Sequence, residues 1–240
     1  MAASTVRYAI PFLLAGGFIL ACRGADAAKR DGGGSTANAS PAGAAVAARN
    51  GAPPTDSIST LADRGRIRGN AQASLWVIEA SDFQCPFCKM WHDSAYAPLV
   101  RDYVAAGKVR LAYLNYPLSQ HQNAMPAAEA AMCASVQDRF WPMHDSLSTS
   151  QPRWETLSNA MPVFDSIAAR LGVAMPDWRD CVARHLTRPL IDADQTRSQT
   201  AGVKSTPSFF VGDQQLAGFQ PYPFFRQIVE AQLAKKGPGR

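Results

Sequence analysis

Two cysteines separated by two residues are the side chains of this sequence best suited to chemistry. They are Cys85 and Cys88, in the stretch SDFQCPFCKMWH that runs from Ser81 to His92. Such a pair can bind a metal, close a loop as a disulfide, or exchange electrons with the cysteines of another protein. The elements that position the pair help to decide among these three.

Strands and a helix flank the two cysteines. Residues 75–80, LWVIEA, form a nearly continuous apolar run, which predicts a strand covered on both faces. A helix is expected over residues 87–106, with Pro98 as a kink, and a second strand over residues 109–116. Strand, helix and strand form a βαβ unit, and such a unit predicts a parallel sheet.

The cysteines lie where the predicted helix begins. A cysteine at this point meets unpaired N–H groups and the positive end of the helix dipole, and both stabilise the thiolate. We therefore expect Cys85 to be an acidic, exposed nucleophile and Cys88, one turn deeper, to be shielded. Pro86 suits the first turn because it has no N–H to lose there. Glu79 ends an apolar strand, so burial should raise its pKa and let it exchange a proton with Cys88, unless its role is purely structural.

Helical spacing dominates residues 121–202, and strands return after them. One helix is expected over residues 124–136 with Asn123 as its cap, and later helices are expected around residues 164–171, 178–185 and 189–201. A hairpin over residues 208–217 turns at Gly212-Asp213, and a helix over residues 222–235 closes the chain. The predicted order is βαβ, a helical block, then ββα.

This arrangement resembles the DsbA-like thiol-disulfide oxidoreductases of bacterial envelopes, which have an α/β thioredoxin-like fold with an inserted helical subdomain. The resemblance covers about residues 60–235. A lone C-x-x-C motif is weak evidence, but within a βαβ unit and followed by a downstream proline it is specific. The residues that carry the resemblance are the Cys85-Pro86-Phe87-Cys88 motif, Glu79 six residues before Cys85, and Thr206-Pro207 before the ββα ending.

The resemblance implies roles for these residues. In this family the proline at the position of Pro207 is cis and packs beside the thiols, so that the backbone of Thr206 faces an extended substrate; Pro86 and Phe87 are expected to contact the substrate too. The implied activity is the oxidation of cysteines in exported proteins, without a cofactor. A disulfide reductase or isomerase is the alternative, because Phe87 is uncharged where the best-known oxidase has His and Thr206 matches the isomerases.

The resemblance also implies partners. A monomer is expected to act on unfolded or extended exported proteins. A membrane protein resembling DsbB, or a vitamin K epoxide reductase homologue, is expected to reoxidise it.

Two further cysteines occur in the predicted helical block. With four cysteines facing the envelope three pairings are open, and the pairing of Cys85 with Cys88 leaves Cys133 with Cys181. We expect a structural disulfide that closes a loop of 48 residues and contributes roughly 4 kcal/mol on the chain-entropy model. The alternative is two buried free thiols.

A metal site is the alternative from a different class. Cys85, Cys88 and His92 could supply three ligands of a thiol-based copper or zinc chaperone. A structural zinc needs a fourth ligand, and the sequence does not place His121, His144 or His185 to provide it. No metal is therefore expected.

The N-terminal residues are typical of an export signal. Arg7 precedes a 14-residue apolar run, shorter than the roughly 20 residues of a membrane span. The run ends at Cys22 in a sequence that resembles a lipobox, so residues 1–22 are expected to be a lipoprotein signal peptide, with cleavage after Ala27 as the alternative. Residues 23–57 are rich in Ala, Gly, Ser and Pro and predict a disordered linker. The folded domain is expected over residues 58–240, in the cell envelope.

The composition narrows the class further. The chain has 24 basic and 19 acidic residues, with no run of Lys or Arg longer than two. This distribution shows no cluster of basic residues of the kind that binds nucleic acid. Its 47% hydrophobic content is enough for a sizeable core.

Overall fold

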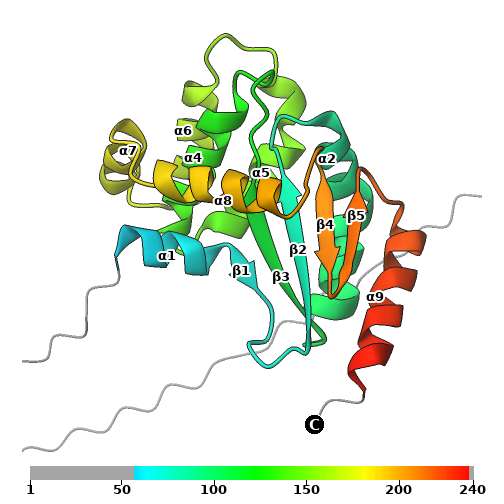
Figure 1. Cartoon of the computed structure of the whole chain (residues 1–240). Helices are drawn as coiled ribbons and strands as arrows, with labels where there is room; N and C mark the ends of the chain where they lie inside the picture. Colours follow the sequence, from blue (N-terminus) through cyan, green and yellow to red (C-terminus); the bar gives the residue numbers. More distant parts are fainter. Residues whose placement is uncertain (1–56, 238–240) are drawn as a thin grey trace, which may run out of the picture. The chain divides into compact units, whose positions relative to one another are not determined.

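A five-stranded sheet lies at the centre of the protein (Figure 1). The computed structural model describes residues 57–237, so the predicted signal peptide and almost all of the predicted linker lie outside the described residues. The strand order is β1-β3-β2-β4-β5, in which β2 and β3 are parallel and the other neighbours antiparallel. The strands are β1 (Ile67–Arg68), β2 (Leu75–Ser81), β3 (Val109–Asn115), β4 (Ser208–Val211) and β5 (Gln214–Ala217).

The predicted βαβ unit is confirmed, with one refinement. A continuous helical segment joins β2 to β3, and it alternates between α-helical and π-helical turns around Pro98. A proline inside a helix removes one backbone hydrogen bond and crowds the preceding turn, and wider turns accommodate that conflict. The segments are α2 (Pro86–Trp91), η1 (His92–Tyr96), α3 (Ala97–Leu99) and η2 (Val100–Val104).

Between β3 and β4 the described chain forms helices joined by turns and loops, and no strand. The helices are α4 (Ala124–Ser135), α5 (Phe140–Thr149), η3 (Gln151–Arg153), α6 (Met161–Arg170), α7 (Met175–Ala183) and α8 (Arg188–Thr200). Two details correct the sequence analysis. Asn123 does not cap α4 through its side chain, because its amide donates to the carbonyl oxygens of Trp154 and Leu157 instead. The helix α7 ends before His185, whose φ is +52°.

The end of the chain forms the predicted ββα unit. β4 and β5 pair as a hairpin, and α9 (Tyr222–Lys236) follows. Gly212 has a φ of +61° at the turn, and a Cβ there would lie 2.6 Å from the side-chain oxygen of Gln232. Glycine is therefore favoured at this turn for both conformation and space. The sequence analysis did not identify α1 (Ile58–Gly65), the two-residue strand β1 or α5.

Two apolar cores hold the elements together. One lies between the sheet and the helices α2 and α9, with Leu75, Trp91, Phe209 and Phe225 fully buried. The other fills the helical block and reaches the sheet through Tyr113 of β3. In Figure 1 the block surrounds the upper left of the sheet, and α9 lies on its right. Among the helices between residues 57 and 237, none combines the length and apolarity needed to cross a bilayer.

Candidate active site

The two cysteines lie at the junction between β2 and α2. Cys85 is the residue before the first turn of α2, Pro86 is the first residue of that helix, and Cys88 lies within the first turn. Both thiols are free. Cys85 is only 4% exposed and Cys88 only 6%, so the expectation that Cys85 is exposed was wrong. The helical block and the Thr206 loop cover the cysteines more than a simple βαβ unit would.

The environment separates the two thiols in acidity. The pKa of Cys85 falls to about 6, chiefly because the Cys88 thiol donates a hydrogen bond to it, with help from Thr206 and from the backbone N–H groups at the start of α2, and against the effect of burial. Burial and the neighbouring Cys85 raise the pKa of Cys88 well above its ordinary value. Near neutral pH the reduced pair therefore holds one thiolate, on Cys85, and one thiol, on Cys88.

Glu79 lies beneath this pair, in the middle of the sheet. Its neighbours across the sheet are Tyr113 on β3 and Phe209 on β4, and it is 2% exposed. Burial raises its pKa to about 7, opposed by a hydrogen bond with Ser81 and by the charge of His92. Within the described residues its Oε2 atom has no hydrogen-bond partner.

A small cavity connects Glu79 to the buried thiol. Its volume is about 10 Å³, at the lower limit for a single water molecule. Its lining includes Glu79, Cys88, His92, Tyr113 and His144. The sequence analysis expected Glu79 to exchange a proton with Cys88, and in the structure both side chains line the same cavity.

The loop before β4 completes the site. The peptide bond between Thr206 and Pro207 is cis, and the Thr206 carbonyl oxygen lies 3.5 Å from the Cys85 sulfur. Next to Cys85 in the chain, Pro86 is exposed and Phe87 is 55% exposed. Met90, which sequence reasoning did not single out, is 47% exposed one turn beyond Phe87. An apolar surface therefore lies beside the two buried sulfurs.

Sequence reasoning also missed the side chains that hold the cysteine loop. Asp82 is 2% exposed and accepts hydrogen bonds from the backbone of Gln84 at 2.7 Å and of Leu118 at 2.9 Å, and His121 lies 2.7 Å from the same carboxylate. The contact to Gln84 is an Asx turn, which the sequence Asp-Phe-Gln could have indicated. Gln151 donates to the carbonyl oxygen of Cys85 at 3.2 Å, and no local pattern signals that contact.

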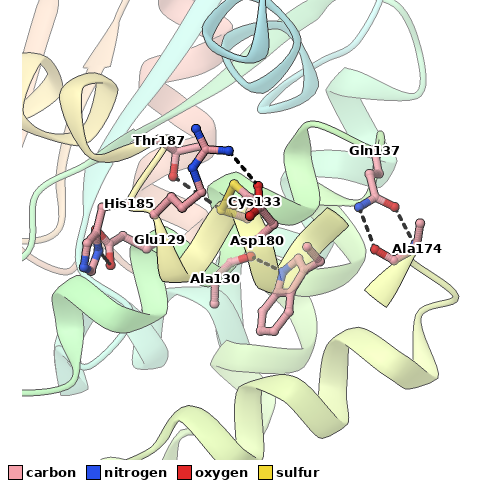
Figure 2. The surroundings of a disulfide bond; sticks show 11 residues. Glu129, Ala130, Cys133, Gln137, Ala174, Asp180, His185 and Thr187 are labelled. Carbon is pink, nitrogen blue, oxygen red and sulfur yellow. Dashed lines mark hydrogen bonds and ion pairs between the residues drawn. A yellow bond between two sulfur atoms is a disulfide. The ribbon is translucent and has the colours of Figure 1, made fainter. Parts of the chain in front are cut away.

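Cys133 and Cys181 are joined in a disulfide between α4 and α7 (Figure 2). Both are buried, at 1% and 5% exposure. The hydroxyl of Thr187 lies 3.7 Å from the Cys133 sulfur, and Trp178 donates to the carbonyl oxygen of Ala130 at 3.1 Å. The disulfide therefore lies within the core of the helical block, away from the Cys85 and Cys88 pair.

The three residues of the alternative metal site, Cys85, Cys88 and His92, do not form a group of converging ligands in the described part of the chain. Within the described residues, three metal-binding side chains converge to within 4.8 Å at one place, and that group consists of His92, His144 and Asp145. Cys85 and Cys88 do not belong to it. Cys22 lies outside the described residues.

Comparisons with known proteins show the family to which this chain belongs. A family model described as thioredoxin matches residues 61–231. Disulfide bond formation protein D of Bacillus subtilis is 21% identical over 71% of the chain and 78% of its own length. The Na(+)/H(+) antiporter NhaA 3 of Salinispora tropica is 32% identical over 67% of the chain. The chain spans only 23% of the length of that antiporter.

Solved structures show the same fold. BdbD from Bacillus subtilis in its oxidised form matches with a TM-score of 0.65 at 21% identity, over 71% of this chain and 94% of that one. The alpha-DsbA1 protein from Wolbachia pipientis matches with a TM-score of 0.64 at 18% identity, over 71% and 92% of the two chains. The α/β thioredoxin-like fold with an inserted helical block is thereby confirmed.

Proposed function

The chain belongs to the thioredoxin family whose model spans residues 61–231, and from this membership we propose that it is a thiol-disulfide oxidoreductase that introduces disulfide bonds into exported proteins. One observation carries the proposal. Two free thiols at the start of a helix have opposite pKa shifts, to about 6 for Cys85 and well above the ordinary value for Cys88. Relatives named for disulfide bond formation support the direction.

The reaction begins from the Cys85–Cys88 disulfide. A substrate thiolate attacks the sulfur of Cys85, a bond between the substrate and Cys85 forms, and the bond to Cys88 breaks. Cys88 leaves with the electron pair and takes up a proton, because its pKa lies far above neutral. Glu79 is the proton donor that the geometry supports, since it lines the same cavity as Cys88 and its pKa is about 7.

The second step releases the product. Another substrate thiolate attacks the substrate-side sulfur of the mixed disulfide, and Cys85 leaves as a thiolate. A thiol of low pKa leaves more readily, so the pKa of about 6 favours this step. In total the substrate dithiol loses two electrons and two protons; the enzyme pair gains both electrons, Cys88 holds one proton and the other passes to solvent.

The shape of the site supports binding of an extended substrate. The exposed side chains of Pro86 and Phe87 follow Cys85 directly in the chain, and the Thr206 carbonyl oxygen lies 3.5 Å from the Cys85 sulfur. An extended segment with a cysteine could contact both at once. Thr206 and Pro207 are therefore assigned to substrate binding together with Pro86 and Phe87.

The proposal extends to the setting of the reaction. Export through the N-terminal signal, a lipid on Cys22 and the linker over residues 23–57 would hold a monomeric domain near the membrane surface. A membrane protein resembling DsbB, or a vitamin K epoxide reductase homologue, would then reoxidise the pair. Sequence patterns alone support this setting.

The reduction potential of the Cys85–Cys88 pair tests the direction. The full chain is equilibrated in glutathione buffers, and free thiols are counted by peptide mass after alkylation, so that Cys22 and the Cys133–Cys181 disulfide are read separately. A value near that of DsbA, about −120 mV, supports oxidation of substrates. A value near that of thioredoxin, about −270 mV, would show that the protein removes disulfides instead.

A further inference from the structure

A second group of polar side chains lies beside the catalytic cavity, where α5 packs against η1. His92, His144 and Asp145 bring their ligand atoms to within 4.8 Å of one another. The two imidazoles are largely buried, with side-chain exposures of 14% for His92 and 3% for His144, whereas the Asp145 side chain is 48% exposed. The group is therefore enclosed on the protein side and open to solvent at Asp145.

The separations match those of a metal site. The Asp145 Oδ1 atom lies 2.8 Å from Nδ1 of His144 and 3.6 Å from Nε2 of His92. A tetrahedral zinc ion with bonds of about 2.0–2.1 Å places neighbouring ligand atoms roughly 3.3 Å apart. The two observed distances lie on either side of this value, and all three ligand atoms lie within 4.8 Å of one another, so side-chain adjustment would bring them to bonding distance.

The surroundings of His92 also favour metal binding. Its Nδ1 atom lies 3.3 Å from Oδ1 of Asp93, whose carboxylate accepts a hydrogen bond from Lys89 at 2.7 Å. Its Nε2 atom is buried, and its contact with Oδ1 of Asp145 at 3.6 Å is longer than a hydrogen bond. A histidine that donates through one nitrogen to a carboxylate presents the other nitrogen as a metal ligand. His92 has this arrangement in the tautomer that carries its proton on Nδ1.

His144 is fixed in place by aromatic side chains. Its ring centroid lies 5.7 Å from that of Phe83 and 5.3 Å from those of Tyr113 and Trp141. Because these rings restrict the imidazole, little conformational entropy remains to be lost on binding.

The charges near the group are mixed. Asp93, Asp145 and Glu79 are acidic, whereas Lys89 and Arg68 are basic. Arg68 donates a hydrogen bond to the Tyr96 hydroxyl at 2.6 Å, and its guanidinium lies 5.0 Å from the centre of the Trp141 ring. Its charge is therefore directed toward Tyr96 and Trp141.

We propose that His92, His144 and Asp145 bind a divalent transition-metal ion, and Zn²⁺ is the ion that best matches two imidazoles and one carboxylate. Three protein ligands leave a fourth position, on the solvent side of Asp145. This site uses no thiol. It therefore differs from the metal site of Cys85, Cys88 and His92 that was considered from the sequence. It does not depend on the proposed function.

Cobalt binding to a protein without free thiols tests the proposal. The full chain carries Cys22→Ser, Cys85→Ser and Cys88→Ser and keeps the Cys133–Cys181 disulfide. We expect one equivalent of Co²⁺ to bind, with the visible absorption of a four- or five-coordinate ion, and Zn²⁺ to displace it. Absence of stoichiometric binding in this protein would overturn the proposal.

Matched variants locate the bound ion. On the same thiol-free background, His92→Gln and Asp145→Asn should each weaken Co²⁺ binding at least about 10-fold, and Asp93→Asn should weaken it by about 10- to 100-fold. His185→Asn removes an imidazole that is 64% exposed and contacts Glu129, and it should leave binding unchanged. Binding that resists His92→Gln, or that His185→Asn weakens equally, would also overturn the proposal.

Discussion

At the scale of single residues, the site depends on a difference in acidity between two neighbouring thiols. A cysteine at the start of a helix already gains from unpaired N–H groups, but the largest effect on Cys85 is the hydrogen bond from Cys88. The same contact and burial keep the proton on Cys88. Each thiol therefore influences the protonation state of the other.

This coupling predicts how Cys85 reacts with an alkylating reagent. In the reduced protein the rate of alkylation should rise with pH and reach half its maximum at about pH 6, because only the thiolate reacts. Cys88→Ala removes the hydrogen bond and should shift this midpoint upward. The rate is followed by peptide mass on the Cys85 peptide, which excludes Cys22. An unchanged midpoint in Cys88→Ala would show that the helix start alone lowers the pKa.

Glu79 predicts a pH dependence of stability. Burial raises its pKa from 4.5 to about 7 in the folded protein, so between these values the folded state holds more protons than the unfolded state. This contribution to stability is fully present below pH 4.5 and is lost as the pH rises through 7. Relative to wild type, Glu79→Gln should therefore gain on the order of 3 kcal/mol between pH 4.5 and pH 8.

Urea unfolding of the oxidised protein measures this difference, since the thiols do not titrate there and none of the causes of the Glu79 shift is a thiol. Glu230→Gln, at a side chain that is 48% exposed and whose pKa is lowered by Arg226 and Tyr103, is the control and should show no comparable change in stability between pH 4.5 and pH 8. A wild-type to Glu79→Gln difference that stays constant with pH would contradict the assignment.

At the scale of elements, the cysteine loop depends on contacts from the helical block. Gln151 of η3 donates to the carbonyl oxygens of Phe83 at 2.6 Å and Cys85 at 3.2 Å. Gln84, in the cysteine loop, also contacts the helical block, because its side chain donates a hydrogen bond to the carbonyl oxygen of Glu155 at 2.7 Å. The block therefore shapes the active-site loop as well as covering it.

The disulfide between α4 and α7 should stabilise this block. Replacing both Cys133 and Cys181 with Ala is expected to cost about 4 kcal/mol, because the unfolded chain regains the freedom of a 48-residue loop. Urea unfolding under oxidising conditions measures the loss, and adding a reductant should destabilise the wild type but not the variant. The alkylation midpoint of Cys85 should stay at about pH 6 in the variant. Equal unfolding midpoints for the two proteins would show that the disulfide is dispensable.

At the scale of the whole molecule, a buried ion pair joins elements from distant parts of the chain. Arg66, between α1 and β1, pairs with Asp194 of α8, and the two are 2% and 0% exposed. The Asp194 carboxylate also accepts hydrogen bonds from the backbone and side-chain amides of Asn115, both at 3.1 Å. The end of α1, the end of β3 and the last helix of the block thus meet at one carboxylate.

Breaking this pair should destabilise the whole fold. Asp194→Asn leaves the buried guanidinium of Arg66 with the half-exposed Asp63 as its remaining acidic contact, and we expect a loss of about 3 kcal/mol in the free energy of unfolding. The double variant Arg66→Met, Asp194→Leu should lose less, because no uncompensated charge remains. Urea unfolding of the three proteins measures both effects. A double variant less stable than Asp194→Asn would show that the pair itself stabilises the fold.

The sequence by itself determined the features that depend on local patterns. Apolar runs and helical spacing predicted β2, β3 and most helices of the block, because the periodicity of side chains follows from the geometry of each element. The cysteine pair, its place at a helix start and the acid six residues before it were also local signals.

Tertiary structure decided what depends on residues far apart in the chain. Cys85 is buried because the Thr206 loop and the helical block close over it, and no pattern around residue 85 contains that information. Likewise Asp145 and His144 meet His92 only because α5 packs against η1. Local sequence determines which element forms, whereas burial, pKa and convergence of ligands depend on how separate elements pack together.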